Sequence, residues 1–177
     1  MTWPDYIEPS AIMVRVLMDR DAPASDGADK SVLLDISSSV DLLKLVDHVS
    51  EQFGQMAGLD EDAVHCLSIA VREAAVNAMK HGNRSDQRKR VRIEYGLAAG
   101  LGRPRVVVRV RDEGDGFDME SLADPLAPDN VSVTSGRGIF LMRSFMDEVQ
   151  VCRLPAGGTE IVMAKAIGTA SRASDPS

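Results

Sequence analysis

The stretch REAAVNAMKHG at residues 72–82 decides which fold the sequence predicts. Glu73 and Asn77 are four residues apart, so both project from one face of a helix. Ala74 and Ala78 beside them are small enough to let a ligand come close. A carboxylate can accept a proton, and an amide oxygen suits Mg²⁺. The alternative is a Glu and Asn pair that hydrogen-bonds on a solvated helix surface, and this segment alone leaves both interpretations open.

Two helices are predicted around this stretch. Asp60 is typical of an N-cap, with acidic residues in the first turn after it, and predicts a helix that runs to about His81. An earlier helix is predicted over residues 40–53, because apolar side chains recur there at helical spacing. Gly54 is expected to end that earlier helix.

Alternating apolar and polar side chains predict strands in the rest of the chain. This pattern marks residues 91–95 and 106–110, which are expected to pair antiparallel with one face in water. Residues 32–36 are predicted to form the first ordered strand, and residues 149–154 and 160–166 a hairpin. A further helix is predicted over residues 138–146, and two helices before the main sheet is an unusual order for a Rossmann unit.

A second motif, RDEGDGF at residues 111–117, lies at the end of a Val-rich strand. Gly114 and Gly116 allow the backbone to turn sharply and approach a flat ligand. Asp112 can accept a hydrogen bond from an exocyclic amine such as that of adenine. An ordinary Asp and Gly turn is the alternative.

A third motif, SGRGIFLMR at residues 135–143, places Gly136 and Gly138 at the start of a helix. Free N–H groups there can bind phosphate oxygens, and Arg137 can add a positive charge. A glycine-rich helix start without a ligand is the alternative. The motif is neither a dinucleotide fingerprint nor a P-loop. The long segment between the second and third motifs is expected to be a functional lid or disordered.

Composition limits the function classes. The chain has 177 residues, 20 basic and 27 acidic, and a net charge of -7, which argues against general binding of nucleic acid. No run of 18 apolar residues and no signal-peptide pattern are present, so we expect a cytoplasmic protein that does not bind membranes. Cys66 and Cys152 are expected to be buried, reduced thiols.

In this order the three motifs resemble the N, G1 and G2 boxes of the GHKL ATPase superfamily. Within it the sequence is most similar to the anti-sigma factor serine kinases of the bacterial stress and sporulation type. The closer resemblance rests on residues 73–82, 116–118, 136–149 and 158–160, and spans about residues 32–167. It implies an α+β fold, a two-layer α/β sandwich of the histidine-kinase-like ATPase type, with a mixed, mainly antiparallel sheet and helices on one face.

The resemblance also implies roles for individual residues, with ATP and Mg²⁺ as cofactors. Glu73 would be the general base for a serine hydroxyl, and Asn77 the Mg²⁺ ligand. The nucleotide-binding residues would be Asp112 at the adenine amino group, Gly114 and Gly116 around it, Thr159 through a water, and Gly136, Arg137 and Gly138 over the phosphates.

The function that the resemblance implies is an ATP-dependent protein serine kinase that binds a sigma factor and phosphorylates an anti-sigma factor antagonist. A homodimer is implied only in the same way. The alternative is a nucleotide-gated binding module with little or no kinase activity, and the presence of Glu73 favours the kinase. A histidine kinase fragment is disfavoured, because the residues around His48 do not match a phospho-accepting site.

Residues 31–167 are expected to form the ATPase domain, between a loose extension over residues 1–30, with one added edge strand as an option, and a flexible tail over residues 168–177. A basic cluster follows the first motif and is expected to be a solvated loop, with an acidic partner surface as the alternative. Its members are Arg84, Arg88, Lys89, Arg90 and Arg92.

Overall fold

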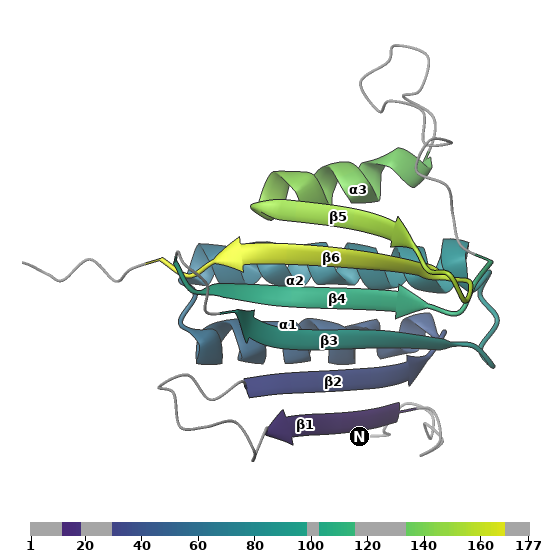
Figure 1. Cartoon of the computed structure of the whole chain (residues 1–177), viewed down its shortest axis with the longest axis horizontal. Helices are drawn as coiled ribbons and strands as arrows, with labels where there is room; N and C mark the ends of the chain where they lie inside the picture. The colour runs from purple at the N-terminus through teal and green to yellow at the C-terminus, as the bar shows by residue number, and fades with distance from the viewer. Residues whose placement is uncertain (1–11, 19–29, 99–102, 116–133, 169–177) are drawn as a thin grey trace, which may run out of the picture.

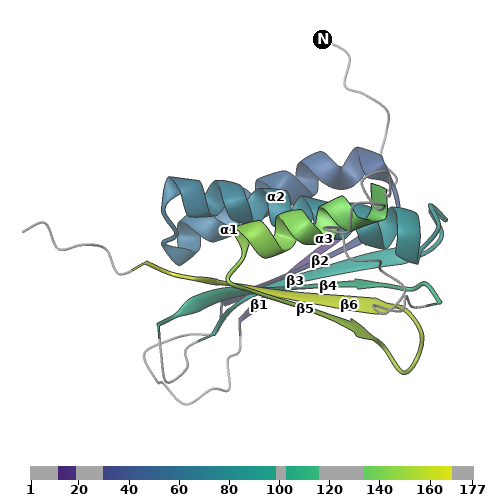
Figure 2. The same cartoon turned by 90° about the horizontal axis from the view of Figure 1, so that it is seen from above.

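The computed structural model describes residues 12–18, 30–98, 103–115 and 134–168. They form two layers, a six-stranded sheet and helices that cover one of its faces (Figures 1 and 2). The strand order is β1-β2-β3-β4-β6-β5, and every pairing is antiparallel. The predicted α+β sandwich is confirmed, and its sheet is wholly antiparallel within the described residues rather than mixed.

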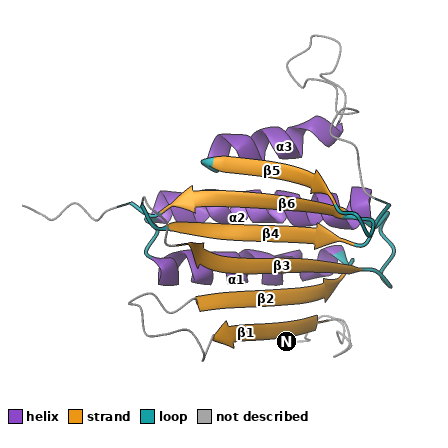
Figure 3. Ribbon diagram, viewed as in Figure 1, coloured by secondary structure: helices purple, strands orange, loops and turns teal. Residues whose placement is uncertain are grey.

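Figure 3 distinguishes the helices from the strands of the two layers. The strands are β1 (Ile12–Met18), β2 (Lys30–Ser37), β3 (Arg90–Ala98), β4 (Arg105–Asp112), β5 (Glu148–Arg153) and β6 (Thr159–Ala166). The helices are α1 (Leu43–Ala57), α2 (Glu61–Asn77) and α3 (Thr134–Phe145), with a 3₁₀ turn η2 (Val40–Leu42) before α1 and a π-helical turn η3 (Ala78–Gly82) after α2. β1 is an edge strand beside β2, as the N-terminal extension allowed.

The core lies between the sheet and the helices. Val106, Val108 and Val110 of β4 point toward the helices and are buried, while Val107 and Arg109 between them are on the other face and less buried. On α2, Ala70 and Ala74 are fully buried, so this helix lies close to the centre of the sheet. The alternation read from the sequence therefore assigns the inner face of the sheet correctly.

The ends of the first two helices differ in how well they were predicted. The side chain of Asp60 accepts a hydrogen bond from the N–H of Ala63 at 2.8 Å, which confirms the N-cap of α2. The prediction that Gly54 ends α1 is wrong, because the helix continues to Ala57 and Gly58 takes the left-handed conformation at φ 87°. Gly54 instead allows close packing, since a Cβ there would lie 3.2 Å from Cγ2 of Val64.

The buried Tyr95 should make the free energy of unfolding depend on pH in the alkaline range. Its side chain is buried, its hydroxyl lies 2.9 Å from Oγ of Ser50, and burial raises its pKa above the ordinary value of 10.0. The folded chain disfavours the ionised phenol, so the contribution of Tyr95 to the free energy of unfolding should be constant below pH 10 and fall above it by about 1.4 kcal/mol per pH unit. Urea titrations between pH 8 and pH 12 should show this slope, and Tyr95→Phe should remove it. An unchanged slope in Tyr95→Phe would contradict this origin.

Candidate functional site

Glu73 and Asn77 lie one turn apart on α2, on the side that faces α3. Gly138 of α3 packs directly against them: a Cβ on Gly138 would lie 3.0 Å from Nδ2 of Asn77 and 3.2 Å from Oε2 of Glu73. The absence of a side chain at Gly138 lets the two helices approach at this point. The structure therefore brings residues of the first and third motifs together.

The side chains of Glu73 and Asn77 are both partly exposed. Neither forms a hydrogen bond or an ion pair with any residue in the described part of the chain. The alternative of a Glu and Asn pair that hydrogen-bonds on the helix surface is therefore wrong. A carboxylate and an amide whose oxygens have no partner among the described residues are left beside each other, and oxygens of these types can bind Mg²⁺.

Asp112 ends β4 and is 7% exposed. Its Oδ1 accepts hydrogen bonds from the N–H of Gly114 at 2.8 Å and from the N–H of Thr159 at 3.2 Å. Its Oδ2 has no hydrogen-bond partner among the described residues. Burial raises the pKa of Asp112, and the N–H groups of Gly114 and Thr159 and the neighbouring Thr159 hydroxyl oppose that shift. Oδ1 is thus held by the fold, and no described residue uses Oδ2.

Three glycines pack around this carboxylate. A Cβ on Gly82 would overlap the carboxyl group of Asp112, and a Cβ on Gly114 would overlap the carbonyl group of Gly82. Gly158, at φ 89°, would place a Cβ on the carbonyl oxygen of Asp112. Gly114 was predicted to shape the pocket, whereas Gly82 and Gly158 were noted only as part of the resemblance and were given no role at Asp112. The Gly157 and Gly158 pair before Thr159 is the sequence signal from which the close packing of Gly158 against Asp112 could have been predicted.

Thr159 begins β6 beside Asp112 and is 5% exposed. Its Oγ1 is buried and has no hydrogen-bond partner among the described residues. The hydroxyl lies beside the Asp112 carboxylate and lowers its pKa, but it makes no well-aligned hydrogen bond, and a buried polar atom in that state can still bind a ligand or a water. Asp112 and Thr159 therefore place a buried carboxylate and a buried hydroxyl side by side.

The remaining predicted residues are only partly described. Gly136 and Arg137 lie in the first turn of α3, which begins at Thr134, four residues before its predicted start. Gly116 lies outside the described residues. Asn77 and Gly82 are linked by the short turn η3, so the group around Glu73 and the group around Asp112 are joined through one continuous helix end.

Two other predictions need correction. Cys66 and Cys152 are free, but neither is fully buried: Cys66 is partly exposed, and Cys152 is exposed on the edge strand β5. The basic cluster is not a solvated loop throughout, since Arg90 and Arg92 belong to β3 and both pair with the buried Asp35, at 2.7 and 3.0 Å. β3 runs beside β2, so these charges stabilise the sheet.

Comparison with known proteins agrees with this geometry. Residues 36–165 match the family model described as the histidine kinase-like ATPase domain. The chain belongs to this family. Family membership confirms the resemblance to the GHKL ATPases, and the relatives described next confirm the resemblance to anti-sigma factor serine kinases.

The curated relatives of this ATPase-family chain are named serine-protein kinase RsbW. The chain is 37% identical to the protein of Bacillus subtilis over 100 residues, which cover 53% of this chain and 60% of the relative. It is 31% identical to the protein of Listeria innocua over 117 residues, which cover 63% of this chain and 71% of the relative. The chain thus spans less than two thirds of the Bacillus subtilis relative.

Proposed function

We propose that this chain is an ATP-dependent protein serine kinase and anti-sigma factor, which binds a sigma factor and phosphorylates an anti-sigma factor antagonist. The observation that carries the proposal is the pair Glu73 and Asn77, unpaired among the described residues and held against Gly138 of α3. The names of the relatives support the same reaction class. Residues 31–167 would be the ATPase domain, and the protein would act in the cytoplasm as a homodimer.

The proposed mechanism divides the work among a few groups. Glu73 accepts the proton of the substrate serine hydroxyl. The serine oxygen bonds to the terminal phosphorus of ATP, and the bond from that phosphorus to the bridging oxygen of ADP breaks. Asn77 would hold Mg²⁺, which when bound neutralises charge on the phosphates. Asp112, Gly114, Gly116 and Thr159 would bind the base. The first turn of α3, with Gly136, Arg137 and Gly138, would bind the phosphates.

Transfer of labelled phosphate tests the kinase against its alternative. The chain is incubated with labelled ATP, Mg²⁺ and the cognate antagonist, and ATP binding is measured separately. Label on an antagonist serine supports the kinase. ATP binding without label on the antagonist would support the nucleotide-gated binding module instead.

Among the residues that the structure describes, every helix is too short or too polar to span a membrane.

Asp112→Asn tests the base pocket. The two N–H groups that bind Oδ1 would hold the amide oxygen, so the amide nitrogen would face the adenine amino group, donor against donor. We expect the affinity for ATP to fall by about tenfold to a hundredfold, the size of a lost charge-assisted hydrogen bond. The free energy of unfolding at neutral pH should stay equal or rise, because burial disfavours the ionised Asp112.

Calorimetric titration with ATP and a urea titration give the two measurements for Asp112→Asn. Asp115→Asn is the control, since Asp115 is exposed and pairs with Arg84 at the surface. Unchanged ATP affinity in Asp112→Asn would remove Asp112 from the base pocket.

A further inference from the structure

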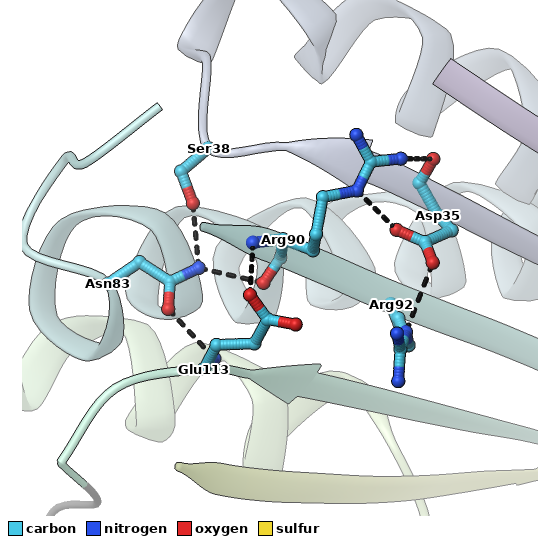
Figure 4. Close-up of polar contacts among 6 residues, drawn as sticks. All are labelled: Asp35, Ser38, Asn83, Arg90, Arg92 and Glu113. Atoms are coloured by element: carbon cyan, nitrogen blue, oxygen red, sulfur yellow. Dashed lines mark hydrogen bonds and ion pairs between the residues drawn. The ribbon is translucent and has the colours of Figure 1, made fainter. Parts of the chain in front are cut away.

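Asn83, the residue after η3, is fully buried and makes three hydrogen bonds through its side chain (Figure 4). Its Nδ2 donates to Oγ of Ser38 at 2.7 Å and to the carbonyl oxygen of Arg90 at 2.8 Å. Its Oδ1 accepts from the N–H of Glu113 at 2.8 Å. Both N–H groups of the amide and its oxygen are thus hydrogen-bonded, and the amide joins the segment after β2, the first residue of β3 and the residue after β4.

The bond to Glu113 acts directly on the base pocket. Glu113 lies between Asp112 and Gly114, and its carboxylate accepts a hydrogen bond from the N–H of Arg90 at 2.9 Å, as Figure 4 also shows. Gly82, next to Asn83 in the chain, is packed against the Asp112 carboxyl group and the Gly114 backbone. The peptide that carries Asp112 is therefore clamped to the helix end by Asn83 from one side and by Gly82 from the other.

The backbone around Asn83 is unusual in a way that favours a positioning role. Its N–H bonds to the carbonyl oxygen of Ala78 at 2.7 Å, which closes the π-helical turn. The next two residues, Arg84 and Ser85, have φ of 54° and 59°, in the left-handed region. Such angles are costly for residues other than glycine and persist where the surrounding structure holds them. A π-helical turn and two strained residues together direct the Asn83 amide inward.

We propose that Asn83 is a positioning residue for recognition of the nucleotide base. It holds the Glu113 peptide so that Oδ2 of Asp112 meets the exocyclic amine of adenine, and it ties that pocket to the helix that carries Asn77. Asn83 touches neither base nor phosphate. The inference rests on the proposed function, because it requires that the chain bind ATP at Asp112.

The test compares ATP with inosine triphosphate, which carries a carbonyl group in place of the adenine amine. Dissociation constants for both nucleotides and for tripolyphosphate are measured with Mg²⁺ at a temperature where each variant is folded. In Asn83→Ala we expect the preference for ATP to fall by about tenfold. Its affinity for tripolyphosphate should stay within about twofold of the natural chain, because Asn77 and the phosphate contacts do not depend on Asn83.

Two variants separate positioning from stability alone. Ser38→Ala removes a buried hydrogen bond of the same amide but leaves the bond to Glu113, so it should lower stability and keep the preference for ATP. Asn83→Asp keeps the acceptor for the Glu113 N–H but sets its second oxygen against the carbonyl oxygen of Arg90, so it should lower stability strongly and still keep the preference at a temperature where it is folded.

The outcomes distinguish the proposed ATP binding from the positioning role of Asn83. A natural chain that binds no ATP would reject the proposed function. A natural chain that prefers ATP, with Asn83→Ala preferring it equally, would reject the positioning role alone. Loss of the preference in Ser38→Ala or in Asn83→Asp would also overturn the role assigned to the bond with Glu113.

Discussion

Asn77→Ala is expected to abolish binding of Mg²⁺-ATP at concentrations that saturate the natural chain. The amide of Asn77 has no hydrogen-bond partner among the described residues and lies against Gly138, so its removal leaves the fold intact and removes the proposed Mg²⁺ ligand. The affinity should fall by at least about a hundredfold, to the value that the natural chain shows in excess EDTA.

Calorimetry with and without Mg²⁺ makes this measurement for Asn77→Ala. Gln55→Ala is a matched control, because it removes an exposed amide from α1, away from the site. Thermal unfolding should be similar in both variants and the natural chain. Binding in Asn77→Ala that still strengthens with Mg²⁺ would show that another group holds the metal.

Glu73→Ala should leave ATP binding largely intact and remove phosphoryl transfer. General-base catalysis contributes about 10²-fold to 10⁴-fold in rate, so the transfer rate to the antagonist should fall by that factor. Glu73 is partly exposed and unpaired within the described residues, and the fold does not depend on its charge. ATP affinity should therefore change by less than about twofold.

Single-turnover transfer of labelled phosphate measures the Glu73 effect. Glu73→Gln keeps the size of the side chain and should be as slow as Glu73→Ala, whereas Glu61→Ala, an exposed acid at the start of the same helix, should transfer at the natural rate. A full transfer rate in Glu73→Ala would show that Glu73 is not the base.

Local sequence patterns predicted the helices and strands well where neighbouring residues alone determine the structure. Alternation along β3 and β4 identified the buried face, because side chains in a strand point to opposite sides of the sheet. Asp60 predicted the start of α2, because an N-cap depends on the next three residues only. The prediction from Gly54 was wrong, since a glycine suits both the end of a helix and the close packing of two helices. Only the neighbouring helix α2 distinguishes the two cases.

The sequence by itself determined the chemical groups of the candidate site: Glu73 and Asn77 on one helical face, Asp112 at a strand end and glycines at a helix start. Helical and strand periods are local properties of the chain, so they can be read from neighbouring residues. The first and third motifs, however, were only expected to belong together because of their order.

Only the tertiary structure decided which groups meet. Oδ1 of Asp112 is held by the N–H of Thr159, 47 positions away, and the Glu113 N–H by Asn83, 30 positions away. No local pattern marks Asn83, because an asparagine after a helix is equally typical of an exposed turn. Its burial and partners depend on how β2, β3 and β4 pair, and those contacts between distant segments form only when the sheet and helices pack together.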